Sequence, residues 1–186
     1  MNRRRWLLAG VLLLLLAGGG TLRLVRLDFP TMGGDVMEFY KIAQAGVPPG
    51  ELLVHSPKYI GGMPPLWFAV HNGFLQSFRL EVNFRNARLP DALTGILTIL
   101  AAFGAGRALG GRRIGLLAAL FVTLQPLHVQ MSRECYFYVP IVLGGFLSLW
   151  ALARLTDRIA AGQSPGAGFY MLAFAGFILS VHVQIS

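Results

Sequence analysis

Charged residues are scarce in this 186-residue chain. They make up 13% of it, whereas soluble domains carry about a quarter. Hydrophobic residues make up 55%, the mean hydropathy is +0.60, and the apolar residues come in blocks rather than in alternation with polar ones. This composition excludes an ordinary soluble domain, and it predicts an all-α integral membrane protein.

Cysteine and acidic residues are also rare. With one cysteine, Cys135, the chain can form neither an intrachain disulfide nor a multi-cysteine metal site. Its 16 lysines and arginines outnumber 8 acidic residues and leave a net charge of +8. The arginines cluster beside the apolar blocks, where membrane topology explains them, so we expect no nucleic-acid partner.

About five apolar segments are long enough to span a membrane. We expect them at about residues 6–25, 90–109, 114–130, 136–155 and 169–186. The first has the shape of a secretory signal peptide, but its uncharged run is long, so we favour a retained helix over a cleaved one. Arg23 and Arg26 are then expected to reach from its end to the membrane surface.

Local signals mark the ends of these segments. Pro90 and Asp91 suit the first helical turn of the second segment. Residues 110–113, Gly-Gly-Arg-Arg, predict a tight turn, and Pro126 is expected to kink the third segment. The chain stops at Ser186 in an apolar stretch, which favours the N-terminal part of a longer polytopic protein that lacks activity by itself.

The arginines predict the orientation. The arginines at 3–5, 112–113, 154 and 158 fall on one side if the segments alternate, and the positive-inside rule assigns that side to the cytoplasm. We therefore expect a protein of the cell (inner) membrane with a cytoplasmic N-terminus. The long first loop, about residues 27–89, then lies on the periplasmic or extracellular side.

This outer loop holds most of the prolines and acids. Two short helices are expected in it, one at about residues 35–45 and one from Pro65. Apolar side chains recur at four-residue steps along the second helix: Leu66, Val70, Phe74 and Phe78. That stripe could lie in the membrane interface or face a small core of the loop itself, and the spacing does not choose between them.

Two acids on the outer face stand out. Asp35 follows two glycines at an expected helix start, where a carboxylate could cap the helix or face a ligand. Glu134 follows the third segment on the same side. Two carboxylates could bind a divalent metal such as Mg²⁺ or Mn²⁺, or one could act as a general base. Arg133 could hold a phosphate, although a topological role is the alternative.

The order of several short motifs resembles the membrane glycosyltransferases of the GT-C fold. The group that it resembles comprises the protein-mannosyltransferase-like and aminoarabinose-transferase-like enzymes that use polyprenyl-phosphate sugars. Each motif is short, but together they extend over roughly residues 25–155. The matching pieces are residues 35–43 (Asp-Val-Met-Glu-Phe-Tyr-Lys-Ile-Ala), Pro64-Pro65-Leu66, Arg88-Leu89-Pro90-Asp91-Ala92-Leu93, residues 111–119, Pro126-Leu127-His128, Ser132-Arg133-Glu134 and Tyr138.

The resemblance implies transfer of a sugar from a polyprenyl-phosphate donor to a lipid, glycan or protein acceptor on the outer face, in contact with membrane lipids. It implies that Asp35 is the catalytic or metal-associated acid and that Glu134 is the second acid. Val36 stands where the family carries a further glutamate. The candidates for substrate binding are Arg133, Glu38, Tyr40 and Lys58. A transporter or flippase of lipid-linked sugars, or a non-catalytic assembly subunit, are the alternatives.

Overall fold

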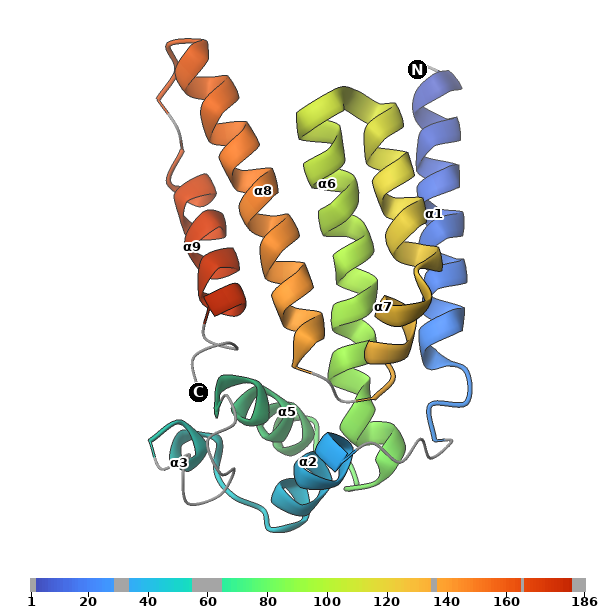
Figure 1. Cartoon of the computed structure of the whole chain (residues 1–186), viewed down its shortest axis with the longest axis vertical. Coiled ribbons are helices and arrows are strands. Elements are labelled where there is room, and N and C mark those ends of the chain that lie inside the picture. Colours follow the sequence, from blue (N-terminus) through green and yellow to red (C-terminus); the bar gives the residue numbers. More distant parts are fainter. Residues whose placement is uncertain (1–2, 29–33, 55–64, 135–136, 165, 182–186) are drawn as a thin grey trace.

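Long helices stand side by side in the computed structural model, and three short helices lie across one end of them (Figure 1). We call the long helices the bundle and the short ones the loop layer. All regular elements among the described residues are helices. The structure describes residues 3–28, 34–54, 65–134, 137–164 and 166–181.

The bundle consists of α1 (Arg3–Leu24), α6 (Phe84–Leu124), α8 (Tyr138–Ala160) and α9 (Ala167–Val181). Within the described residues, α1, α6 and α8 are long and apolar enough to cross a membrane, and α9 is a shorter apolar helix. The predicted class of all-α integral membrane protein is confirmed. The number of spans stays a prediction.

Helix α6 reverses direction in its middle. Gly110 and Gly111 leave helical geometry, and Gly111 has a φ of 81°, a conformation that residues with a Cβ rarely adopt. The two arms of α6 therefore run side by side (Figure 1). The tight turn expected at residues 110–113 lies at this reversal.

The second arm of α6 stops before Pro126 instead of bending there. It ends at Leu124, and α7 (Pro126–Met131) begins after Gln125, whose φ and ψ are −61° and 111°. The Gln125 side-chain oxygen accepts a hydrogen bond from the Leu127 N–H at 3.1 Å. The expected kink was therefore wrong: proline suits the first turn of a new helix, and Gln125 caps that helix.

The loop layer contains α2 (Gly34–Gln44), α3 (Pro49–Val54) and α5 (Pro65–Ser77). Its core joins all three helices to the start of α6. The rings of Phe39 and Phe68 stack within it at 3.9 Å. The buried residues of this core are Phe39, Ile42, Val47, Leu52, Trp67, Phe68, Ala69 and Ala87.

The apolar stripe predicted on α5 does not form that core. Val70 and Phe78 are 40% and 66% exposed, whereas Trp67, Phe68 and Leu75 on other faces of the helix are buried. The loop layer therefore has its own core and still presents apolar side chains outward.

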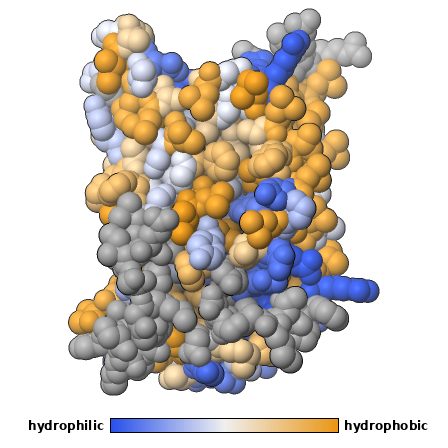
Figure 2. Space-filling model, in the orientation of Figure 1, coloured by the Kyte–Doolittle hydropathy of each residue, from blue (hydrophilic) through white to orange (hydrophobic). Residues whose placement is uncertain are grey.

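The face of the bundle seen in Figure 2 is also largely apolar. Exposed examples on three helices are Leu14 on α1, Phe121 on α6 and Phe174 on α9. A continuous exposed apolar surface of this kind suits contact with lipid. The bundle buries a smaller cluster around Ile99 and Val122.

Candidate functional site

Helix α6 begins deeper in the loop layer than the sequence suggested. Asn83 caps it, because its side-chain oxygen accepts a hydrogen bond from the Asn86 N–H at 2.9 Å. Pro90 and Asp91 are therefore inside the helix, and the prediction that they occupy its first turn was wrong. One consequence is that Arg88 and Asp91 are both buried where the bundle meets the loop layer.

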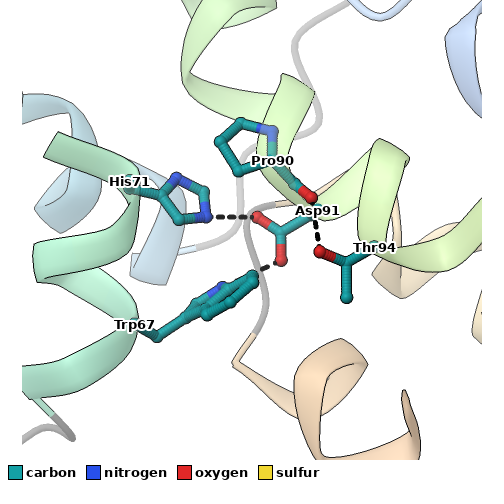
Figure 3. Close-up of polar contacts among 5 residues, drawn as sticks. All are labelled: Trp67, His71, Pro90, Asp91 and Thr94. Carbon is teal, nitrogen blue, oxygen red and sulfur yellow. Dashed lines mark hydrogen bonds and ion pairs between the residues drawn. The ribbon is translucent and has the colours of Figure 1, made fainter. Parts of the chain in front are cut away.

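Asp91 is the centre of a buried polar cluster that joins α6 to α5 (Figure 3). Trp67 donates an indole hydrogen bond to one carboxylate oxygen at 3.0 Å. His71 Nε2 lies 2.8 Å from the other oxygen, close enough for an ion pair although not aligned as a hydrogen bond. Trp67 and His71 are four residues apart on α5, so they share one face of that helix. These contacts join α5 to α6. Because Asp91 is fully buried, the cluster is closed to solvent.

The cluster also reaches α2, the helix that carries Asp35. The ring of His71 lies 4.5 Å from the ring of Phe39 on α2. Phe39 in turn stacks on Phe68 of α5. The position of α2 is thus fixed through α5 to the Asp91 carboxylate on α6.

A groove of about 530 Å³ opens beside this joint. Its polar lining comes from Arg88 on α6 and from three residues in or just after α7. The rest of the lining is apolar and comes from α1, the second arm of α6 and α7. The polar residues are Arg88, Gln130, Arg133 and Glu134, and the apolar ones are Leu22, Leu124, Pro126 and Val129.

Backbone carbonyl groups just beyond the C-terminus of α1 hold the two groove arginines. Arg88 Nη1 donates to the Leu27 carbonyl at 2.9 Å. Arg133 Nη2 donates to the carbonyls of Val25 and Arg26 at 3.0 and 3.2 Å. Carbonyls at a helix end lack partners in the helix and favour nearby cations. In the part of the chain that the structure describes, no carboxylate forms an ion pair with Arg133, so its charge remains available to an anionic ligand.

Glu134 is buried beside these cations with 8% of its surface exposed. Gln130 Nε2 donates to its Oε1 at 3.1 Å. The groove therefore combines positive charge, one carboxylate and an amide with apolar walls. Such a lining suits a ligand with an anionic end and a hydrocarbon portion.

A second buried cluster lies next to the groove, around Arg23 of α1. Arg23 donates to the carbonyls of Gly19 and Val122, both at 3.0 Å, and the Val122 carbonyl belongs to the last turn of α6. The expectation that Arg23 reaches the membrane surface was wrong, because it is fully buried and satisfies a free carbonyl at this helix end. Burial lowers the pKa of His128 on α7 to about 4, and the charge of Arg23 acts in the same direction.

The structure brings together some of the predicted site residues. Arg133 and Glu134 line one groove. Tyr40 on α2 stacks on Phe84 at 4.7 Å, and the Phe84 ring lies 5.9 Å from the Arg88 guanidinium. An aromatic contact thus connects α2 to the groove.

Other predicted residues cannot be placed in this site. Asp35 and Glu38 belong to α2, but their side chains lie outside the described part of the structure, as does Lys58. The pairing of Asp35 with Glu134, and a metal bound by the two, therefore stay predictions. The described side chains contain no group of three or more histidine, cysteine or acidic residues that could hold a metal. Glu134 nevertheless offers the hard oxygen ligands that Mg²⁺ and Mn²⁺ prefer.

Sequence reasoning missed the roles of Arg88, Gln130 and the pair of Asp91 with His71. The sequence does contain a signal for the burial of Arg88 and Asp91, because Asn83 is a good helix cap and its side chain accepts from the Asn86 N–H. A helix that starts there has Arg88 and Asp91 beyond its first turn, and their spacing of three places them on neighbouring positions of the helix surface. Nothing in the spacing indicated that His71 would meet Asp91.

Comparison with known proteins gives one family. No curated protein and no solved structure matches the chain. The family model described as dolichyl-phosphate-mannose-protein mannosyltransferase matches residues 63–184, well over half of the 186 residues. The match includes α5, α6, α7, α8 and α9 and all four polar residues of the groove. Helices α1 and α2 lie outside it. The chain therefore belongs to the dolichyl-phosphate-mannose-protein mannosyltransferase family.

Proposed function

We propose that this protein takes part in transfer of a sugar from a polyprenyl-phosphate donor to an acceptor, at the membrane face where the loop layer lies. Membership of the mannosyltransferase family supports a donor of this class. The observation that carries the proposal is the groove in which Arg88 and Arg133 adjoin apolar walls. A phosphate attached to a hydrocarbon chain has matching chemistry.

The two arginines would balance the charge of the donor phosphate. Guanidinium groups bind phosphate oxygens through paired N–H donors. Arg88 and Arg133 each already use one amino nitrogen on a backbone carbonyl, which orients the rest of the guanidinium group. Charge that develops on the departing lipid phosphate would be stabilised by these pre-positioned cations.

The proposed reaction is a single displacement at the anomeric carbon. The acceptor hydroxyl oxygen forms a bond to that carbon while the bond to the phosphate oxygen breaks, and the lipid phosphate leaves with the electron pair. We assign Asp35 as the base that takes the hydroxyl proton, with inversion at the anomeric carbon. Glu38, Tyr40 and Lys58 are proposed to contact the sugar or the acceptor.

Glu134 is proposed as the second acid of the site. Its contact with Gln130 fixes one carboxylate oxygen, and the carboxylate would orient the acceptor or contribute to a divalent-metal site. A bound Mg²⁺ or Mn²⁺ would supply further positive charge near the phosphate. The arginine distribution supports a cell-membrane location with the loop layer on the periplasmic or extracellular side.

Reconstitution in liposomes with polyprenyl-phosphate mannose tests this function. We expect the intact protein to yield mannosylated acceptor and free polyprenyl phosphate. Movement of the donor across the bilayer without transfer would instead support a transporter. Binding of the donor with neither reaction would support a non-catalytic assembly subunit, and either result would overturn the proposal.

A further inference from the structure

The end of the bundle opposite the loop layer carries a second groove, between α6 and α8. It has a volume of about 370 Å³. The residues on α6 follow helical spacing and lie along one face, and the two residues on α8 are four positions apart. The lining consists of Leu100, Phe103, Gly104 and Arg107 from α6 and Trp150 and Arg154 from α8.

Gly104 allows the Trp150 indole to lie against the backbone of α6. A Cβ atom at position 104 would come within 2.6–2.8 Å of three ring atoms of Trp150, which is too close for any side chain. The indole therefore packs into the space that the glycine leaves, and it forms one wall of the groove. Tryptophan is enriched at membrane–water interfaces because its ring is apolar and its N–H is polar.

Positive charge gathers at the same place. Arg107 is exposed, and within the described residues it forms no ion pair. Arg154 approaches Asp157 at 3.9 Å, but both side chains are substantially exposed, so this pair contributes little. A neighbouring hollow of about 480 Å³ shares Trp150 and Arg154 and adds Arg158. The two hollows are thus lined by three arginines, Arg107, Arg154 and Arg158, and by one aspartate, Asp157.

We propose that this groove binds an anionic phospholipid. Arg107 and Arg154 hold the headgroup phosphate, one acyl chain lies along Leu100 and Phe103, and Trp150 occupies the level between them. Basic pockets between membrane helices bind anionic headgroups by this combination of charge and apolar contact. The site is at the other end of the bundle from the proposed transfer reaction, and it does not depend on that proposal.

Arginines that serve only to orient a membrane protein act through their number and side, not through their position. Arg112 is at the same end of the bundle, exposed on the turn of α6, and outside the groove lining. Replacing Arg112 removes the same charge as replacing Arg107. This pair of variants therefore separates a built site from a general excess of positive charge.

Native mass spectrometry of the intact protein in a neutral detergent provides the test, with phosphatidylglycerol titrated against phosphatidylcholine and inorganic phosphate. We expect bound phosphatidylglycerol, and we expect Arg107→Gln and Arg154→Gln each to weaken it about fivefold. Arg112→Gln should leave the affinity unchanged.

Three results would overturn the proposal. Equal binding of phosphatidylcholine would show that charge is not recognised. An equal loss in Arg112→Gln would show that only the overall charge matters. Displacement of the lipid by millimolar inorganic phosphate would show a simple anion site without a role for the apolar groove. Thermal unfolding of each variant checks that the fold is retained.

Discussion

Asp91 and His71 meet in the interior of the protein, with carboxylate Oδ2 and imidazole Nε2 separated by 2.8 Å. The two residues come from different parts of the fold: Asp91 from the bundle helix α6 and His71 from the loop-layer helix α5. Because both are almost fully buried, neither group can turn to water when its partner is lost. This contact couples the loop layer, and with it α2, to the bundle.

Replacing Asp91 with asparagine should therefore destabilise the protein. The asparagine keeps a side-chain oxygen for Trp67 but removes the charge that faces His71. We expect a loss of about 1.5–3 kcal/mol in the free energy of unfolding, measured by thermal or denaturant unfolding in detergent. A double-mutant cycle with His71→Gln should give a coupling energy above about 0.5 kcal/mol. Strictly additive effects would show that the two side chains do not interact.

Arg133→Gln should weaken binding of the lipid-phosphate donor. The substitution removes a cation that lines the groove and that forms no described ion pair. The loss of one charge-assisted hydrogen bond corresponds to about a tenfold increase in the KM for the donor or more. Steady-state transfer kinetics measure this effect, with Arg112→Gln at the opposite end of the bundle as the charge-matched control. An unchanged KM would remove Arg133 from the site.

Gly95→Ala should disrupt the cluster around Arg23. A Cβ at position 95 would lie 2.8 Å from Arg23 Nε and 2.7 Å from Ser132 Cβ, and it would overlap the Ser132 hydroxyl. Overpacking of this kind costs about 1–3 kcal/mol. Gly18→Ala in α1 is the matched control, because nothing lies within 4 Å of its added methyl group, and it should be neutral or stabilising. Equal unfolding temperatures for the two variants would contradict the described packing.

Stability should fall between about pH 6.5 and pH 4 because of His128. Its pKa is lowered to about 4 in the folded protein, whereas an unfolded histidine titrates near 6.5. In this window the unfolded chain binds a proton that the folded chain does not, so acid favours unfolding by at most about 3 kcal/mol. Above pH 6.5 the effect is absent. The unfolding temperature of His128→Gln should lack this component of the pH dependence, and an identical pH profile would exclude it.

The helices of the bundle were largely predictable, because a long apolar run in the sequence indicates a helix that can span a membrane. The turn at Gly110 and Gly111 was also predictable, because a pair of glycines indicates a turn of the chain. The start of α6 was not: Pro90 is a strong local signal for a helix start, and the better cap at Asn83 lies seven residues earlier. The helix therefore extends beyond the apolar run into the loop layer.

The polar contacts were the least predictable part of the site. Asp91 and His71 are twenty positions apart, and only the packing of α5 on α6 brings them together. The same holds for Arg133, which binds carbonyls more than a hundred residues away. Such contacts depend on tertiary structure, for which spacing along the chain carries no signal. Glu134 was proposed from its side of the membrane and from the family resemblance, and its role stays a prediction.

In the proposed reaction the Asp35 carboxylate is the base that activates the acceptor hydroxyl. The decisive measurement is the rate of mannose transfer by the intact Asp35→Asn variant, compared with Asp28→Asn, an exposed aspartate just beyond α1. We predict that Asp35→Asn lowers kcat by at least about 100-fold with little change in unfolding temperature, whereas Asp28→Asn retains the wild-type rate. Wild-type transfer by Asp35→Asn would contradict the proposed mechanism.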